Sequence, residues 1–440
     1  DLHLSLRRQR QMCIRDRDHA LLIKDSLKYS VTKIIPGVMG LIAVIVFIRM
    51  IGAEEYGKYS IQLSFLMAYS AFTVGWLNQS TLRYYSKYKN DQKLPQIFFI
   101  GLIFSLLLGS LILVISSLVI VNNQKFPLSS IGLTLFLALC SFQFLSAVLR
   151  SQLRPNTIIM VTVLQSLLGI VLPLLLLWLL GLKHKYLLLG LAGSYIALPL
   201  VLLIINIDLS KIFRPIASGG WYHHKLILSE FFRYGFPLSL WFGISLSLPF
   251  FDRYFIEYFY SFEITGIYAS FTDLVIRIFS ILLFPLTLAV HPRIMSSWNN
   301  NDHAGAIILW RQALQYQMVI FIILIGVLYL ASGIIFDLIM LILPGLDLSY
   351  SFLLFPILVG GFLWQFALLC HKPLEMDQRT GLMVLLMLGA LIINLLGNII
   401  YLPRYGIIAT AYTYIASASV YILSNIYFSR KKFKMVLQLS

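Results

Sequence analysis

The stretch QIFFIGLIFSLLLGSLILVISSLVIV occupies residues 96–121 and contains no charged side chain. A helix rises by about 1.5 Å per residue, so a helix of this length can cross the roughly 30 Å hydrocarbon core of a bilayer. Other apolar segments of similar length repeat the pattern along the chain. The predicted spans are 30–51, 59–80, 96–121, 128–149, 158–181, 186–207, 234–256, 266–290, 313–336, 347–370, 381–402 and 406–428. We therefore predict an all-α polytopic membrane protein with about 12 transmembrane helices.

Composition and charge point to the same class. Hydrophobic residues make up 59% of the chain and charged residues 12%, whereas soluble domains carry roughly 25% charged residues. The net charge of +16 would suggest a nucleic-acid partner in a soluble protein. Here the basic residues concentrate in every second connection, with 21 on one side of the membrane and 6 on the other. Because Lys and Arg accumulate on the cytoplasmic side, we expect both termini in the cytoplasm and no nucleic-acid partner.

The first residues differ from the rest. Residues 1–17 are basic and lack the apolar pattern, and Met12-Cys13-Ile14-Arg15-Asp16 resembles the translation of a transposon-end sequencing adapter. We predict that residues 1–17 are a sequencing or assembly artefact, or a disordered tail. The remaining chain is predicted to form an N-lobe over residues 18–215 and a C-lobe over residues 216–440, which ends in a basic cytoplasmic tail.

Short echoes suggest that the two lobes are repeats. Ser194-Tyr195-Ile196-Ala197 in the sixth span is matched by Thr413-Tyr414-Ile415-Ala416 in the twelfth. Gly57-Lys58-Tyr59, after the first span, is matched by Gly266-Ile267-Tyr268, after the seventh. Six spans are an even number, so both lobes would start on the same side of the membrane. They would be parallel repeats related by an axis along the membrane normal, with chance similarity between apolar segments as the alternative.

Motifs of soluble enzymes are weak in this sequence. The three cysteines have no metal-type spacing, and His223-His224 fits a surface pair better than a metal site. No glycine-rich phosphate loop precedes a helix in the required strand context, so direct ATP use is not expected. We predict that the protein is not an enzyme and that it has no catalytic residue, no metal site and no cofactor, with H⁺ or Na⁺ as the candidate coupling ion.

Charged side chains within two spans are the candidate site. Asp252, Arg253 and Glu257 lie in the seventh span, and Asp273 and Arg277 lie in the eighth. A charge at mid-membrane costs a few kcal/mol, about 2.5–3.5, so such residues should face the protein interior or a wet cavity. Arg253 and Glu257 are four residues apart, as are Asp273 and Arg277. Two local ion pairs that merely neutralise each other are therefore one interpretation, and a polar pathway between the lobes is the other.

In the second interpretation the basic side chains bind substrate. Arg253 and Arg277 would hold an anionic group such as a phosphate through charge-assisted hydrogen bonds. Arg49 and Arg83 are further candidate substrate-binding residues, although both lie at span ends. Side chains at such positions can also snorkel to the membrane interface, so a structural role is the favoured alternative for these two.

In the same interpretation the acidic side chains couple transport to an ion gradient. Asp252, Asp273 and Glu257 are the candidates to take up a proton or Na⁺. Pro249 lies one turn before Asp252. Because proline removes a backbone hydrogen bond and bends a helix, Pro249 is a candidate hinge, with ordinary proline tolerance in membrane helices as the alternative.

Four stretches carry a resemblance to a known family: 52–59 (GAEEYGKY), 251–256 (FDRYFI), 266–269 (GIYA) and the segment from Asn394 to Gly406. Together they resemble the polysaccharide transporter branch of the multidrug/oligosaccharidyl-lipid/polysaccharide exporter (MOP) superfamily, in particular the O-antigen flippases of the Wzx type. The resemblance covers about residues 24–430. It implies a bacterial cytoplasmic (inner) membrane protein with twelve helices in two lobes around a central cavity, and an acidic–basic position in the family that corresponds to Asp252 and Arg253.

The resemblance also implies a function. Members of this branch move a polyprenyl-diphosphate-linked oligosaccharide, the repeat unit of a surface polysaccharide such as the O-antigen of lipopolysaccharide, across the membrane by alternating access. A cation gradient is the expected energy source, and a polysaccharide polymerase and glycosyltransferases are expected partners. One alternative is a cation-coupled drug or metabolite exporter of the same architecture. The other is a membrane glycosyltransferase, ligase or polymerase that acts on the same lipid carrier, which the short and nearly charge-free external connections disfavour.

Overall fold

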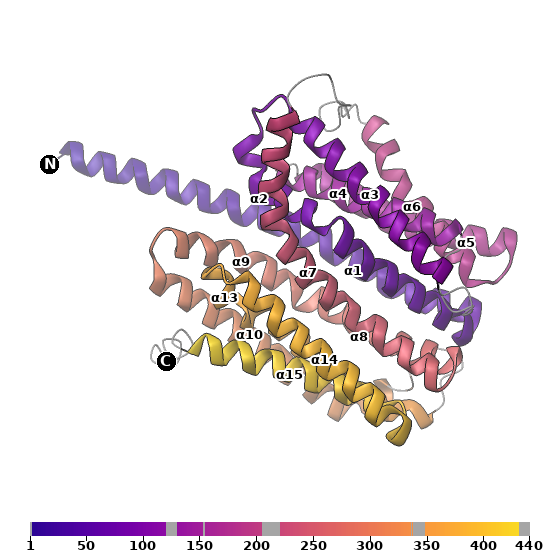
Figure 1. Cartoon of the computed structure of the whole chain (residues 1–440). Coiled ribbons are helices and arrows are strands. Elements are labelled where there is room, and N and C mark those ends of the chain that lie inside the picture. Colours follow the sequence, from indigo (N-terminus) through magenta and orange to yellow (C-terminus); the bar gives the residue numbers. More distant parts are fainter. Residues whose placement is uncertain are drawn as a thin grey trace.

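The structure is a computed structural model that describes residues 2–119, 130–152, 155–204, 221–335, 337 and 348–430. Within these ranges the chain forms helices joined by short turns, with no β-strand. Figure 1 shows most of these helices running roughly along one common direction. Such packing is expected of segments that cross one bilayer, because a helix satisfies all of its own backbone hydrogen bonds there. The predicted all-α class is confirmed.

The helices follow one another in two groups. We call α1–α6 the N-lobe and α7–α15 the C-lobe. The N-lobe contains α1 (Leu2–Thr73), α2 (Gly75–Tyr88), α3 (Leu94–Val119), α4 (Ser130–Ser151), α5 (Pro155–Leu180) and α6 (His184–Ile204). The C-lobe contains α7 (Trp221–Phe259), α8 (Phe262–Leu282), α9 (Phe284–Asn299), α10 (His303–Leu330), the 3₁₀ helix η2 (Leu348–Leu353), α12 (Leu354–Cys370), α13 (Lys372–Met376), α14 (Thr380–Tyr405) and α15 (Ile408–Phe428).

Helix α1 contains the first predicted span and most of the second, which ends in α2. Gly52 interrupts its helical backbone with φ 80° and ψ 171°, a conformation that glycine adopts without a steric cost. The rings of Phe47 and Tyr59 lie 6.0 Å apart, although twelve residues of straight helix would separate them by about 18 Å. The chain therefore folds back at Gly52, and the two parts of α1 form an antiparallel pair.

The other helices overlap the predicted spans, although α7 and α10 begin earlier than predicted and the eighth predicted span is divided at Leu283 between α8 and α9. In the residues that the structure describes, nine helical segments are long and apolar enough to cross a membrane, and one of them, Ile34–Thr73, holds most of the first two spans. Helices α6 and α15 coincide with the sixth and twelfth predicted spans. Large apolar side chains face outward, as in α3, where Phe104, Leu107 and Leu111 are each more than half exposed. Lipid tails would cover such a surface, which supports the multi-pass membrane class.

Two predictions on domain organisation are not decided by this structure. The predicted lobe boundary at 215/216 lies outside the described residues. Helix α1 begins at Leu2. That residues 1–17 are an artefact or a disordered tail stays a prediction.

The lobes touch along α1, α2, α7 and α8. Figure 1 shows α1 beside α7 and α8 in the middle of the molecule, with α3–α6 on one side and α14 and α15 on the other. At one end, glycines allow the two backbones to meet: a Cβ atom on Gly57 would lie 2.0 Å from the Phe262 carbonyl oxygen, and a Cβ atom on Gly266 would lie 1.8 Å from the Ala53 carbonyl oxygen. Gly57 and Gly266 are the two glycines of the sequence echo, and the fold brings them into contact.

Farther along the interface, α2 packs on α7. The Ser239 hydroxyl donates a 2.6 Å hydrogen bond to the Ala71 carbonyl oxygen, and the Ser80 hydroxyl donates to the Phe231 carbonyl oxygen at 2.5 Å. A Cβ atom on Gly235 would lie 2.0 Å from the Trp76 carbonyl oxygen. Small residues thus let the backbones approach and hydroxyl groups link them, as is common between membrane helices.

Candidate functional site between the lobes

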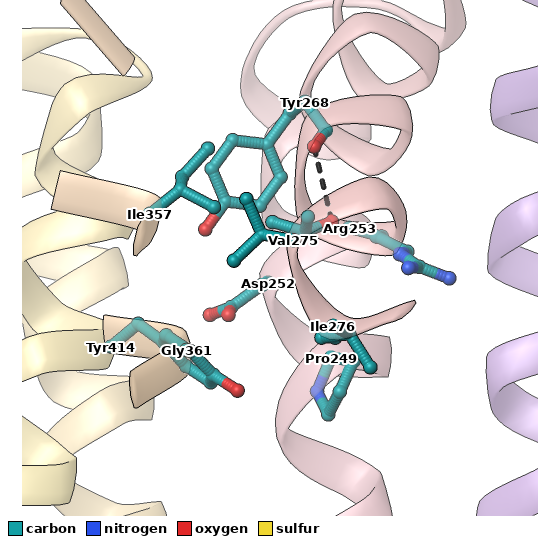
Figure 2. A pocket seen from close by; sticks show the side chains of 10 residues that line it. Pro249, Asp252, Arg253, Tyr268, Val275, Ile276, Ile357, Gly361 and Tyr414 are labelled. Carbon is teal, nitrogen blue, oxygen red and sulfur yellow. Dashed lines mark hydrogen bonds between the residues drawn. The ribbon is translucent and has the colours of Figure 1, made fainter. Parts of the chain in front are cut away.

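Neighbouring residues of α7 point in different directions. Figure 2 shows the Asp252 carboxylate directed toward the C-lobe helices that carry Ile357 and Tyr414, while the Arg253 guanidinium points away, toward the N-lobe. Both side chains are almost fully buried. The acidic–basic pair of the sequence is therefore not an ion pair in space, and the two charges belong to different surroundings.

Arg253 joins the lobes. Its Nη2 atom lies 2.5 Å from Oδ1 of Asp273 on α8, and its Nη1 atom donates a 3.1 Å hydrogen bond to the Ser60 carbonyl oxygen on α1. The other oxygen of Asp273 accepts a 2.9 Å hydrogen bond from the Tyr56 hydroxyl. A buried charge is tolerated when it is paired and its remaining hydrogen bonds are satisfied. Tyr56 and Ser60, both on α1 of the N-lobe, supply the other hydrogen-bond partners of this network.

The interpretation with two local ion pairs is wrong for α8. Asp273 pairs with Arg253, twenty positions earlier in the chain, and not with Arg277 one turn away. The physical reason is that Arg253 already needs a counter-charge at this buried position. A pair within α8 would leave Arg253 without a carboxylate, whereas Arg277 is only partly buried.

A cavity of about 250 Å³ lies beside this network, between the lobes. Residues of both parts of α1 form one wall, and residues of α7 and α8 form the other. They include Gly40, Phe47, Tyr59, Ser64, Leu246, Pro249, Arg253, Asp273 and Arg277. Serine and tyrosine hydroxyls and two arginines make part of the lining polar, although every contributing helix is a membrane span.

Arg277 is the charged group that this cavity leaves uncompensated. Among the residues that the structure describes, no carboxylate lies within ion-pair distance of its guanidinium. The guanidinium rests against the α1 backbone, because a Cβ atom on Gly40 would lie 2.6 Å from the Arg277 Cζ atom. Since Asp273 neutralises Arg253, the cavity carries one net positive charge. It can therefore bind an anion by charge-assisted hydrogen bonds.

Asp252 lies in a separate polar site inside the C-lobe. Its Oδ1 atom accepts hydrogen bonds from the side-chain amides of Asn394 and Asn398 on α14, at 2.9 and 3.0 Å. A small cavity of about 10 Å³ adjoins it, bordered by Tyr268 and Tyr414. This is close to the smallest volume that holds one water molecule. The Asn398 Oδ1 atom is buried and lacks a hydrogen-bond partner among the described residues, so the site still offers oxygen acceptors to a proton or a small cation.

The remaining predicted site residues are placed elsewhere. Glu257 is buried one turn beyond Arg253 on α7, and Arg49 is exposed near the end of the first span; neither lines the inter-lobe cavity. Arg83 lines a different cavity at the other end of the interface. Pro249 borders both the inter-lobe cavity and the Asp252 site, within a continuous α7.

Sequence reasoning did not assign four polar partners: Tyr56, Ser60, Asn394 and Asn398. The spacing of Asn394 and Asn398, four residues apart in an apolar span, was an available signal, since polar residues inside membrane spans are rare and face the interior. In the part of the chain that the structure describes, no group of three or more His, Cys, Asp or Glu residues is arranged to hold a metal ion.

The arrangement of two lobes with a central cavity is the fold of a class of membrane transporter. The outward-facing conformation of a multidrug resistance MATE family transporter of the MOP superfamily matches 95% of this chain over 97% of its own, with a TM-score of 0.63 and 14% identity. The inward-facing conformation of such a transporter matches with a TM-score of 0.60, 12% identity and coverage of 95% and 96%. A MOP superfamily transporter from Pyrococcus furiosus matches with a TM-score of 0.63, 15% identity and the same coverage. At these identities the likeness shows the fold alone.

Residues 22–298, more than half of the chain, match the family described as polysaccharide biosynthesis protein, and the chain belongs to this family. Together with the fold, this match confirms the predicted polysaccharide branch of the MOP superfamily. The Wzx type stays a prediction. No curated protein sequence matches the chain.

Proposed function

We propose that this protein is a flippase for a polyprenyl-diphosphate-linked oligosaccharide, the repeat unit of a surface polysaccharide such as an O-antigen. It would act in a bacterial cytoplasmic membrane with both termini in the cytoplasm, beside the glycosyltransferases and the polymerase that make and use its substrate. The family and the fold support a transporter in polysaccharide biosynthesis. The observation that carries the substrate class is Arg277.

Arg277 presents an unneutralised guanidinium to a cavity between membrane spans. Leaving a cation without a counter-charge at such a place is costly, so a bound ligand is expected to supply the negative charge. A diphosphate suits this role because guanidinium forms paired, charge-assisted hydrogen bonds with phosphate oxygens. The position between the lobes would let the polyprenyl tail remain in the bilayer while the sugars occupy the cavity.

We further propose that Asp252 couples this movement to H⁺ or Na⁺. The Asp252 site and the Arg253 network are adjacent on one continuous helix, α7. Uptake of a cation at Asp252 would alter its hydrogen bonds to Asn394 and Asn398 and thereby shift α7 relative to α14. The same shift would act on the contacts of Arg253 with Asp273 and Ser60, which must break when the lobes separate.

The drug-exporter alternative has one supporting observation, the likeness to multidrug transporters. The cavity argues against cationic drugs, because its net charge is positive. A glycosyltransferase, ligase or polymerase would instead need an acid–base pair beside its substrate, whereas Asp273 is committed to Arg253 and Tyr56.

The test uses purified protein in liposomes with a fluorescent polyprenyl-diphosphate disaccharide, whose inversion is measured by chemical quenching from one side. We expect Arg277→Gln to slow inversion at least about tenfold and Arg277→Lys to retain part of the rate, because lysine keeps the charge but not the planar fork. Arg404→Gln is the matched control, since Arg404 is exposed on α14, far along the chain from the cavity residues. Full inversion by Arg277→Gln, or efflux of ethidium with no lipid inversion, would refute the proposal.

A further inference from the structure

A second cavity lies at the opposite end of the lobe interface from Gly57 and Gly266. It has a volume of about 440 Å³, and we call it the vestibule. Both lobes line it: Gln79 and Arg83 come from α2, Tyr234 from α7, His291 from α9, and Lys372 and Glu375 from α13. All of these residues belong to the span ends and connections that the charge pattern assigns to the cytoplasmic side.

The charges of the vestibule leave Arg83 unneutralised. Lys372 Nζ lies 2.5 Å from Glu375 Oε2, so these two compensate each other. Burial, and then the nearby Lys372 ammonium, lower the pKa of His291 below its usual value, so His291 is neutral at pH 7. The Arg83 guanidinium lies over the Tyr234 ring, 5.6 Å from its centre, and no carboxylate among the described residues pairs with it. The vestibule therefore carries a net positive charge from the N-lobe.

One face of α7 connects the vestibule to the inter-lobe cavity. Leu238 and Phe242 line the vestibule, and Leu246, Pro249 and Arg253 line the inter-lobe cavity. These residues follow one another at intervals of three or four, so they share one face of the helix. Phe242 and Leu246 are each 39% exposed, so this face is not sealed by packing between the two cavities.

A second wall, formed by α8 and α9, also runs from the inter-lobe cavity to the vestibule. Arg277 on α8 lines the inter-lobe cavity, and Phe284, Thr287 and His291 on α9 line the vestibule. Fourteen residues separate Arg277 from His291, which corresponds to about 21 Å of helix. Arg277 lines the inter-lobe cavity and Arg83 lines the vestibule, so they are two separate positions at which one anionic group can bind.

We propose that the vestibule is a second binding site, which captures the phosphate group of a lipid-linked substrate at the cytoplasmic membrane surface before it reaches Arg277. The inference rests on the proposed function. Arg83 is the ligand-contacting cation, and the aromatic side chains of Tyr234 and Trp241 provide the wall against which the adjoining apolar or sugar part packs. The position suits a headgroup because a phosphate that enters from the cytoplasmic leaflet meets Arg83 first.

The experiment counts bound probe molecules. Farnesyl diphosphate, a soluble isoprenyl diphosphate, is titrated against the purified full chain in phosphatidylcholine nanodiscs and the stoichiometry is read by native mass spectrometry. We expect two molecules per chain. Arg83→Gln and Arg277→Gln should each weaken one site at least about tenfold and leave one, and the double variant should bind none. Arg83 is exposed, so its substitution is not expected to disturb folding, and Arg83→Lys should restore part of the affinity through its charge.

The outcomes separate the two proposals. Two molecules bound by Arg83→Gln, with one lost in Arg277→Gln, would overturn the vestibule site and leave the proposed function intact. One molecule lost in Arg83→Gln and none in Arg277→Gln would support the vestibule and contradict the proposed central site. Loss of the Arg83 site when the nanodiscs contain phosphatidylglycerol would assign it to ordinary anionic phospholipid and overturn substrate capture.

Discussion

Adding one methyl group at Gly266 should open the end of the lobe interface that Gly57 and Gly266 close. In the structure a Cβ atom at Gly266 would lie 1.8 Å from the Ala53 carbonyl oxygen, whereas contacts under 3.0 Å are essentially never observed. Both partners are backbone, so no flexible side chain can move aside. The lobes would have to separate locally by about 1.2 Å, the difference between these two distances.

Such overpacking typically costs about 1–3 kcal/mol. The cost falls on the closed arrangement alone, so the ratio of closed to open molecules should decrease about 5- to 150-fold. Gly57→Ala should act in the same way, because its Cβ atom would lie 2.0 Å from the Phe262 carbonyl oxygen. Gly389→Ala is the matched control: it adds the same methyl group within α14, where nothing lies within 4 Å of the new atom.

The assay is crosslinking between cysteines introduced at Glu54 and Glu263, exposed residues beside the contact on α1 and α8. The chain's own cysteines are replaced by serine beforehand. With a short bismaleimide, we expect Gly266→Ala to crosslink more slowly than Gly389→Ala. Equal crosslinking rates for the two variants would show that the backbones do not meet at Gly266, and the argument for a closed end would fail.

Three further predictions concern the buried polar groups. Asp273→Asn should lower the free energy of unfolding by about 3–5 kcal/mol, because Arg253 would lose its counter-charge in a buried place. Tyr56→Phe should lower it by only about 0.5–1.5 kcal/mol, because one hydrogen bond is lost. Thermal unfolding in detergent checks this order, and a Tyr56→Phe variant less stable than Asp273→Asn would contradict it. Asp252→Asn should retain binding of farnesyl diphosphate yet make lipid inversion insensitive to an imposed H⁺ or Na⁺ gradient; inversion that still follows the gradient would remove Asp252 from coupling. Gly40→Leu should displace the Arg277 guanidinium, because a Cβ atom there would lie 2.6 Å from Arg277 Cζ, and should reduce probe binding at the inter-lobe cavity at least about tenfold. Gly381→Leu, where nothing lies within 4 Å of the new Cβ atom, is the control.

The sequence predicted which charged residues form the site but not which residues they pair with. The apolar spans made Asp252, Arg253, Asp273 and Arg277 stand out, because charge inside a membrane segment is costly wherever it faces. Spacing within one helix suggested the wrong partner for Asp273, since a four-residue interval says only that two side chains share a face. Such an interval carries no information on which neighbouring helix packs against that face. The partner of Asp273 is Arg253, which comes from α7.

By itself, the sequence determined the polytopic class and the approximate positions of the spans, and its basic connections predict an orientation. These follow from hydropathy and charge summed over local segments, which act without reference to the rest of the fold. Packing alone decided that Asp252 and Arg253, neighbours in the chain, serve two different sites, because successive residues on a helix point in directions about 100° apart and meet different helices. Packing also brought Gly57 against the α8 backbone and left Arg277, rather than Arg253, as the uncompensated charge of the cavity.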